Sequence, residues 1–285
     1  MKWQGRRTSN NVEDRRGVAV KGAIGGGVGG GILILVVMLI LNFCGGGDLS
    51  QPTDNSQLAI PETESTYQAT QEEDELVQFV SVVLAETEDV WTEIFSKEGM
   101  EYIYPSLVLY TDHVESACGL AGSATGPFYC PGDQKIYIDL SFYKELQDKF
   151  KAPGDFAMAY VISHEVGHHI QNLLGIIDEV SSVQQNLNEA EANEYSIRLE
   201  LQADYLAGVW GHYVNRMNLL EKGDLEEALN AASAVGDDRI QKEAQGYVVP
   251  DSFTHGTSEQ RQRWFYKGFI SGTLEDGDTF NTDDL

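Results

Sequence analysis

A polar cluster inside an apolar helical segment is the feature that most constrains how this sequence can fold. Residues 155–175, DFAMAYVISHEVGHHIQNLLG, are mostly apolar, and the Asp155 and Gly175 that bound them are typical of a helix start and end. The middle of this segment carries three histidines and one glutamate within about one and a half helical turns. Unpaired imidazoles and carboxylates are costly inside a protein, so the pattern predicts a site rather than plain packing.

The spacing of His164 and His168 predicts a metal site. Residues four apart share one helix face, so both imidazoles can reach an ion at the ~2.0–2.1 Å of a zinc–nitrogen bond. Glu165 projects about 100° further round the helix, where a general base for a zinc-activated water belongs. The pattern His-Glu-x-x-His therefore encodes two zinc ligands and a base, whereas core or surface histidines are the alternative. We expect His169 to support the site or cap the helix rather than bind metal.

A third ligand has to come from elsewhere, because catalytic zinc takes three protein ligands and keeps one position for water. Gln171 and Leu174 occupy the positions where metzincins need glycine and histidine, so that class is excluded. A second long helix, predicted over residues 189–220, contains Glu200 and Asp204 on one face. We predict that Glu200 binds zinc and that Asp204 accepts a hydrogen bond from a ligand imidazole. Surface carboxylates on a solvated helix are the alternative.

The N-terminal part of the chain predicts a membrane anchor. Residues 1–21 hold six basic and two acidic side chains, and residues 22–47 hold no charge over a length that can cross a bilayer, about 20 residues. The positive-inside rule then places residues 1–21 in the cytoplasm and the remaining chain outside, as a single-pass membrane protein. A cleaved signal peptide is the alternative. We expect a flexible linker at 48–74, a catalytic domain at 75–274 and a loose acidic tail at 275–285.

The net charge limits the kinds of partner that the main body can bind, and the cysteines bear on whether it lies in an oxidising compartment. The formal net charge is −26, which disfavours nucleic acid as a partner of the main body. Cys118 and Cys130 flank a glycine-rich loop, and outside the cytoplasm they are expected to form a disulfide. Metal binding by this pair is the weaker alternative, since the spacing lacks a short knuckle.

Periodicity predicts an α+β fold with a small β-sheet and mainly helical structure. Helical spacing of apolar residues is expected over 76–99, and two β-rich runs follow at 105–111 and 134–142. A shorter acidic helix is predicted between 221 and 236, and Thr257 with Gln260 forms the capping box of a last helix. The second β-run, just before the metal-binding helix, offers a possible edge for an extended peptide substrate.

Several long motifs carry a resemblance to a known family. These are MKWQGRRTSNNVEDRR, CGLAGSATGPFYCPGDQKIYIDLSF, HEVGHH, ELQADYLAGVW and DSFTHGTSEQR. The chain resembles the bacterial neutral zinc metallopeptidases of the YpfJ-like kind over almost its whole length outside the linker and tail. The resemblance implies a membrane-anchored zincin of the gluzincin type, with a zincin-like catalytic domain behind the anchor and Zn²⁺ as cofactor. It implies no particular substrate.

The function that we expect is zinc-dependent hydrolysis of peptide bonds, with a peptide or protein as substrate and Glu165 as general base. A donor for the developing oxyanion is also needed, and His255 in the loop FTHGTS is the best candidate. A helix-entry histidine that bonds the backbone is the other interpretation of His255, and Tyr205 and Tyr247 are weaker donor candidates. Alternatives to a peptidase are a zincin-fold binding or scaffold protein and a nonpeptide metallohydrolase. The sequence leaves the oligomeric state open.

Overall fold

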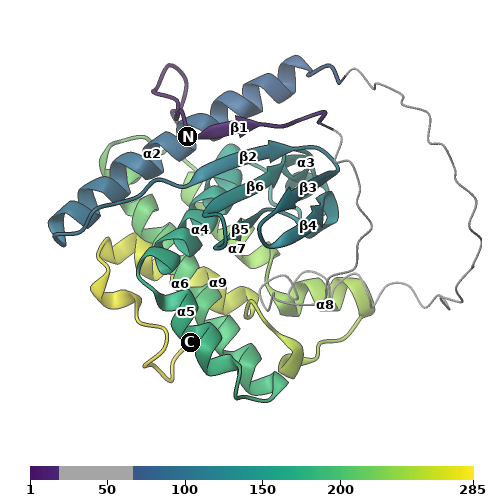
Figure 1. Cartoon of the computed structure of the whole chain (residues 1–285), viewed down its shortest axis with the longest axis vertical. Helices are drawn as coiled ribbons and strands as arrows, with labels where there is room; N and C mark the ends of the chain where they lie inside the picture. The colour runs from purple at the N-terminus through teal and green to yellow at the C-terminus, as the bar shows by residue number, and fades with distance from the viewer. Residues whose placement is uncertain (19–66) are drawn as a thin grey trace, which may run out of the picture.

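The computed structural model describes residues 1–18 and 67–285 (Figure 1). Helices dominate, and a small sheet lies on one side of them, which confirms the predicted α+β class with mainly helical structure. The strands are β1 Val12–Asp14, β2 Ser106–Tyr110, β3 His113–Ser116, β4 Gly119–Gly122, β5 Phe128–Cys130 and β6 Lys135–Asp139. The helices are α2 Gln71–Lys97, α3 Ser141–Asp148, α4 Asp155–Leu173, α5 Ile176–Gln184, α6 Glu189–Arg216, α7 Asp224–Ala234, α8 Asp237–Gln245 and α9 Ser258–Ser271, with single 3-10 turns at Ser123–Thr125, Pro250–Ser252 and Glu275–Gly277.

The main sheet has the strand order β1-β2-β6-β5, in which β1, β2 and β6 are parallel and β5 is antiparallel to β6. Strands β3 and β4 form a separate hairpin. Strand β6 is the β-run that we expected to offer a substrate edge, but it lies inside the sheet, with β2 along one side and β5 along the other over Lys135–Tyr137, so it is not an edge strand. The edge strand next to β6 is β5, which belongs to the loop bounded by the two cysteines, and β1 is the edge strand on the other side of the sheet.

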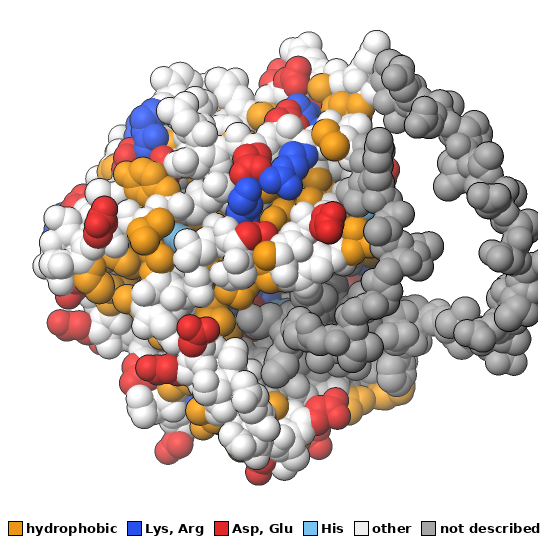
Figure 2. Space-filling view, viewed as in Figure 1, with side chains coloured by type: hydrophobic (Ala, Val, Ile, Leu, Met, Phe, Trp, Pro, Cys, Tyr) orange, Lys and Arg blue, Asp and Glu red, His pale blue; other side chains and the backbone are white. Residues whose placement is uncertain are grey.

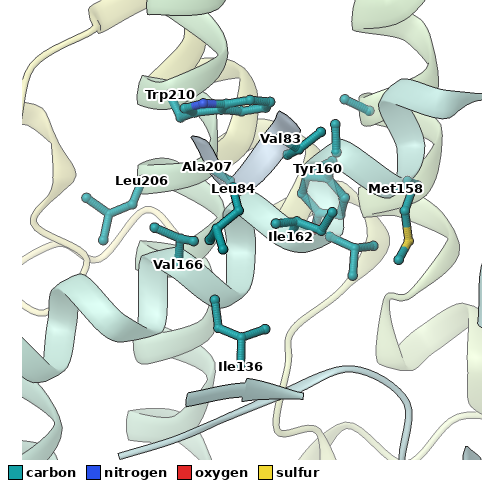
Figure 3. Close-up of a cluster of buried hydrophobic side chains, with 14 of the residues drawn as sticks. Val83, Leu84, Ile136, Met158, Tyr160, Ile162, Val166, Leu206, Ala207 and Trp210 are labelled. Atoms are coloured by element: carbon teal, nitrogen blue, oxygen red, sulfur yellow. The ribbon is translucent and has the colours of Figure 1, made fainter. Parts of the chain in front are cut away.

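Helix α4 runs through the centre of the molecule, and most of its side chains are buried, including polar ones of the motif. Figure 3 shows its Val166 between Leu206 of α6 and Leu84 of α2, with Ile136 of the sheet below. The N-cap is Gly154, one residue before the predicted Asp155, and Asp155 is the first helical residue. Gly154 has φ +122°, a conformation that glycine adopts without strain. The site residues on α4 are therefore held by a helix that packs against α2, α6 and the sheet and leaves one stretch facing a cavity.

The two ends of the chain differ from the sequence-based expectation. Residues 1–18 do not stand apart from the body, because β1 pairs with β2 and the segment lies along α2 (Figure 1). The tail is not loose either: Arg198 of α6 donates to the carbonyl oxygens of Thr279 and Thr282 at 2.5 and 2.9 Å, and Thr279 is buried. Helix α2 starts at Gln71 behind a capping box of Thr70 and Glu73, so the folded body also begins before residue 75.

Two further predictions concern the cysteines and the anchor. Cys118 and Cys130 form a disulfide, which confirms the predicted pairing and ties β5 to the β3–β4 hairpin. Among residues 1–18 and 67–285, no helix combines the length and apolar character that a bilayer crossing requires. The predicted anchor at 22–47 lies outside the described residues.

Candidate metal centre

Close packing of α4 against α6 brings the predicted ligands together. A Cβ on Gly167 of α4 would lie 2.9 Å from the carbonyl oxygen of Ala203 on α6, so only glycine permits this approach. Within one helical turn of this contact, α4 presents His164 and His168 and α6 presents Glu200. Their ligand atoms all lie within 4.8 Å of one another.

The separations of these atoms fit a zinc ion. His164 Nε2 lies 3.2 Å from Glu200 Oε2, and His168 Nε2 lies 3.4 Å from Glu200 Oε1. Two ligands on a tetrahedral zinc with bonds of ~2.0–2.1 Å are about 3.3 Å apart. Two imidazoles and one carboxylate are also a donor set that catalytic zinc takes. The three residues can therefore hold Zn²⁺ with little rearrangement.

Both histidines are held so that Nε2 faces the centre. His164 Nδ1 lies 2.9 Å from Asp204 Oδ1, in agreement with the predicted contact, and His168 Nδ1 lies 2.9 Å from Gln171 Oε1. The Gln171 amide is itself oriented, because its Nε2 donates to the Leu199 carbonyl oxygen at 2.7 Å. A carboxylate or amide oxygen that accepts from Nδ1–H fixes the tautomer in which Nε2 is free to bind a metal.

Arg261 of α9 is a site residue that the sequence did not single out. Its side chain is buried, and its Nε and Nη2 donate to Asp204 Oδ2 and Oδ1 at 2.8 and 3.0 Å. Tyr160 donates to the same carboxylate at 2.5 Å, and Arg261 Nη2 lies 3.4 Å from His164 Nδ1. The guanidinium therefore balances the charge of Asp204 behind the ligand histidine. Helix α9 reaches this position because Gly208 of α6 leaves no side chain between the two helices.

The charges of the site shift the pKa values of its members in opposite directions. Burial lowers the pKa of His164, but the Asp204 and Glu200 carboxylates outweigh it and raise that pKa to about 9. Burial opposes ionisation of Glu200 and Asp204, yet His168 and His255 hold the pKa of Glu200 well below its usual range. Arg261 in turn keeps the pKa of Asp204 low. The site thus attracts cations, and protons compete for its ligand atoms.

Glu165 and the centre line one cavity of about 540 Å³. Burial raises the pKa of the Glu165 carboxyl, although His164 and His168 oppose the shift, and a raised pKa suits a general base. Much of the cavity wall is apolar, and it includes side chains of the edge strand and of α3, α5 and α8: Phe128, Tyr129, Phe142, Ile177 and Ile240.

His255 also lines this cavity and pairs with a carboxylate rather than with the backbone. Its Nδ1 lies 3.2 Å from Asp237 Oδ1, while the other oxygen of Asp237 accepts from the His255 N–H at 2.7 Å. Burial lowers the pKa of His255, but Asp237 and Glu200 raise it above its usual value. The two weaker candidates lie elsewhere: Tyr205 donates to the Thr273 carbonyl oxygen, and Tyr247 is exposed and is not among the residues that line the cavity.

His169 is placed away from the centre. Its Nε2 lies 2.7 Å from the Ile103 carbonyl oxygen and its Nδ1 2.9 Å from the Tyr129 hydroxyl, so the ring joins α4 to the edge strand. Burial lowers its pKa to about 4.

A second cluster of carboxylates among the described residues, Asp155, Asp224 and Glu227, lies at the N-terminal end of α4, and the Met1 ammonium pairs with the first two.

The site holds the side chains that a zinc metallopeptidase uses, and comparison with known proteins agrees at the level of the family. The chain belongs to the family described as "Putative neutral zinc metallopeptidase", whose model matches residues 1–280. It is 50% identical over 290 residues to "Uncharacterized protein YpfJ" of Escherichia coli (strain K12), covering 98% of this chain and 99% of that protein. It is 41% identical over 195 residues to "Uncharacterized protein Rv2575" of Mycobacterium tuberculosis, covering 65% of each. No solved structure matches. Zinc is the metal that the family implies.

Proposed function

We propose that the protein hydrolyses peptide bonds, with His164, His168 and Glu200 as zinc ligands and Glu165 as general base. The observation that carries the proposal is the assembly of these four side chains from two helices at the wall of one cavity. Zinc, when bound, supplies a Lewis acid that polarises a scissile carbonyl and acidifies a water.

The protein's own residues then account for proton movement. Glu165 accepts the proton of the attacking water and passes it to the leaving amine, for which its raised pKa is suited. His255 faces the cavity, and Asp237 at its Nδ1 supports the protonated ring, so Nε2 can donate to a developing oxyanion. Asp204 and Gln171 act through the ligand histidines by fixing their rings.

The edge strand β5 supports an extended peptide as substrate. Its outer edge is unpaired within the described part of the chain, and its Phe128 and Tyr129 line the cavity. A peptide that adds to this edge would gain main-chain hydrogen bonds and would place alternate side chains toward the apolar wall. We therefore expect a preference for a bulky apolar side chain next to the scissile bond.

The test is turnover by the purified full chain, zinc-loaded or chelated, with a diverse peptide pool and with a parallel set of esters. Zinc-dependent cleavage of peptides after or before apolar residues is expected. Zinc-dependent turnover of esters alone would show a nonpeptide hydrolase instead. His255→Gln is expected to lower kcat with zinc content unchanged, and Tyr247→Phe serves as the control that leaves kcat unaltered.

A further inference from the structure

We propose that residues 1–18 are an integral part of the folded body and lie on the same side of any membrane as residues 67–285. The single-pass arrangement expected from the sequence puts these two parts on opposite sides. The proposal concerns only the two described parts of the chain and is independent of the enzymatic function.

Backbone pairing is the first argument. Strand β1 runs parallel to β2, and the pairing is extended by hydrogen bonds from Leu107 N to Asn11 O and from Arg15 N to Leu109 O, both 2.8 Å. Leu107 and Leu109 of β2 are fully buried. Parallel neighbours require a crossover, and α2 provides it, so β1, α2 and β2 form one β-α-β unit. The chain enters residues 19–66 from one strand of this unit and leaves them into its helix. A bilayer cannot separate the parts of a unit joined by such hydrogen bonds.

Two buried carboxylates of α2 provide the second argument. Glu86 and Glu88 are each 2% exposed. Within the described residues, Glu86 accepts hydrogen bonds only from Arg6, at 2.6 and 3.1 Å. Glu88 accepts from Arg7 at 3.0 Å, from Asn11 at 2.7 Å and from the Ser9 hydroxyl. Every donor to these two carboxylates thus comes from residues 6–11. Buried carboxylates need such partners, so α2 is built to receive this segment.

The N-terminal basic residues are engaged in the same contacts. Arg6 and Arg7 pair with α2, and Arg16 pairs with Asp14 and with Asp74 of α2. Lys135 of β6 reaches back to Glu13. In Figure 2 the basic side chains on the face shown lie beside acidic ones rather than in a basic patch of their own. Packing on an acidic body is therefore a sufficient reason for these charges, and they need not mark a cytoplasmic N-terminus.

An aromatic contact and two more backbone hydrogen bonds also attach residues 1–18 to the body. Trp3 packs edge-on against Phe79 of α2, with ring centroids 5.6 Å apart. Two further backbone hydrogen bonds, from Lys2 N to Leu219 O and from Ser9 N to Ser81 O, attach the segment at 2.8 and 2.9 Å. The attachment thus extends from residue 2 to β1 and involves α2, β2 and the segment that follows α6.

The test is labelling of single cysteines in the full chain, expressed in bacteria and studied in spheroplasts. Thr8→Cys and Lys222→Cys report the two parts, since both positions are exposed. Cys44→Ser serves as background, because Cys44 is the only cysteine outside the disulfide. With a membrane-impermeant maleimide, both cysteines are expected to label in the same state, either in intact spheroplasts or only after permeabilisation. Labelling of one in intact spheroplasts and of the other only after permeabilisation would overturn the proposal.

Removal of the charges of Arg6 and Arg7 tests whether these residues serve to pack residues 1–18 on α2 or to fix the side of the membrane on which they lie. The double variant Arg6→Gln, Arg7→Gln is expected to leave the labelling side unchanged and to lower the Tm of the full chain by several degrees. Lys242→Gln, an exposed residue of α8 with no ion pair among the described residues, is the control and is expected to change neither. A change of the labelled side in the double variant, or an unchanged Tm, would contradict the proposal.

Discussion

Replacement of Arg261 by methionine tests whether the buried guanidinium is needed behind the zinc ligands. Asp204 is fully buried and accepts from Arg261 at 2.8 and 3.0 Å. Methionine fills similar space but leaves the carboxylate with Tyr160 and His164 as its remaining donors. Removal of one partner of a buried ion pair costs about 3–5 kcal/mol, because the other charge stays buried. We expect Arg261→Met to lower the free energy of unfolding by this amount.

Arg263→Met on the same helix is the matched control. Arg263 pairs with Asp284, but these side chains are 42% and 87% exposed, and exposed pairs contribute roughly 0–1 kcal/mol. Urea unfolding of the zinc-free protein gives both free energies, and an unchanged m value would show that both states remain comparable. An effect of Arg261→Met as small as that of Arg263→Met would refute the reasoning.

A double variant and zinc affinity show how Arg261 acts. In Arg261→Met with Asp204→Asn the buried charge is gone, so the combined loss of stability is expected to be smaller than the sum of the single losses. If Arg261 also holds Asp204 against His164, Arg261→Met lowers zinc affinity by roughly 10–100-fold, the usual effect of losing a partner of a metal ligand. Competition with a chelator measures the affinity, and Arg263→Met should leave it unchanged.

Three further predictions concern pH and packing. Burial lowers the pKa of His169 to about 4, whereas in the unfolded chain it is about 6.5. Between these values only the unfolded state binds the proton, so the free energy of unfolding should fall by ~3 kcal/mol as the pH falls from 6.5 to 4. Urea unfolding across this range should show a shallower pH dependence for His169→Gln, and an equal slope would contradict the assignment. Without metal, the pKa of His164 is about 9, so zinc must displace a proton, and its affinity should fall about tenfold per pH unit from 8 to 6; a pH-independent affinity would be evidence against this. A Cβ on Gly268 would lie 2.0 Å from the Tyr205 carbonyl oxygen, so Gly268→Ala should force α6 and α9 apart and lower the free energy of unfolding by ~1–3 kcal/mol. Ile270→Ala, at an exposed position of the same helix, is the control. A Tm of Gly268→Ala no lower than that of this control would exclude the crowding.

The sequence predicted those parts of the site that depend on local spacing. His164 and His168 share a helix face whatever surrounds the helix, and the same holds for Glu200 and Asp204. The small residues Ala203, Ala207 and Gly211 recur at this spacing along α6, a pattern that favours close packing, and Gly167 does approach Ala203 closely.

Parts that depend on contacts distant in sequence were missed. Arg261 is an ordinary helical arginine in the sequence, and only the packing of α9 on α6 brings it to Asp204. Gln171 was considered only as a departure from the metzincin pattern, although a side chain three residues after His168 can reach its ring. Strand β1 has three residues, too few for a periodic pattern, and its basic neighbours favoured a different interpretation.

The role of Glu165 as the base of a zinc peptidase is tested most directly by comparison of the purified full chain with its Glu165→Gln variant. Zinc content and cleavage of a diverse peptide library are measured on both proteins. We expect equal zinc in the two proteins and cleavage by the wild type alone. Equal cleavage by the variant would remove Glu165 from the mechanism, and a wild type that binds no zinc would contradict the account as a whole.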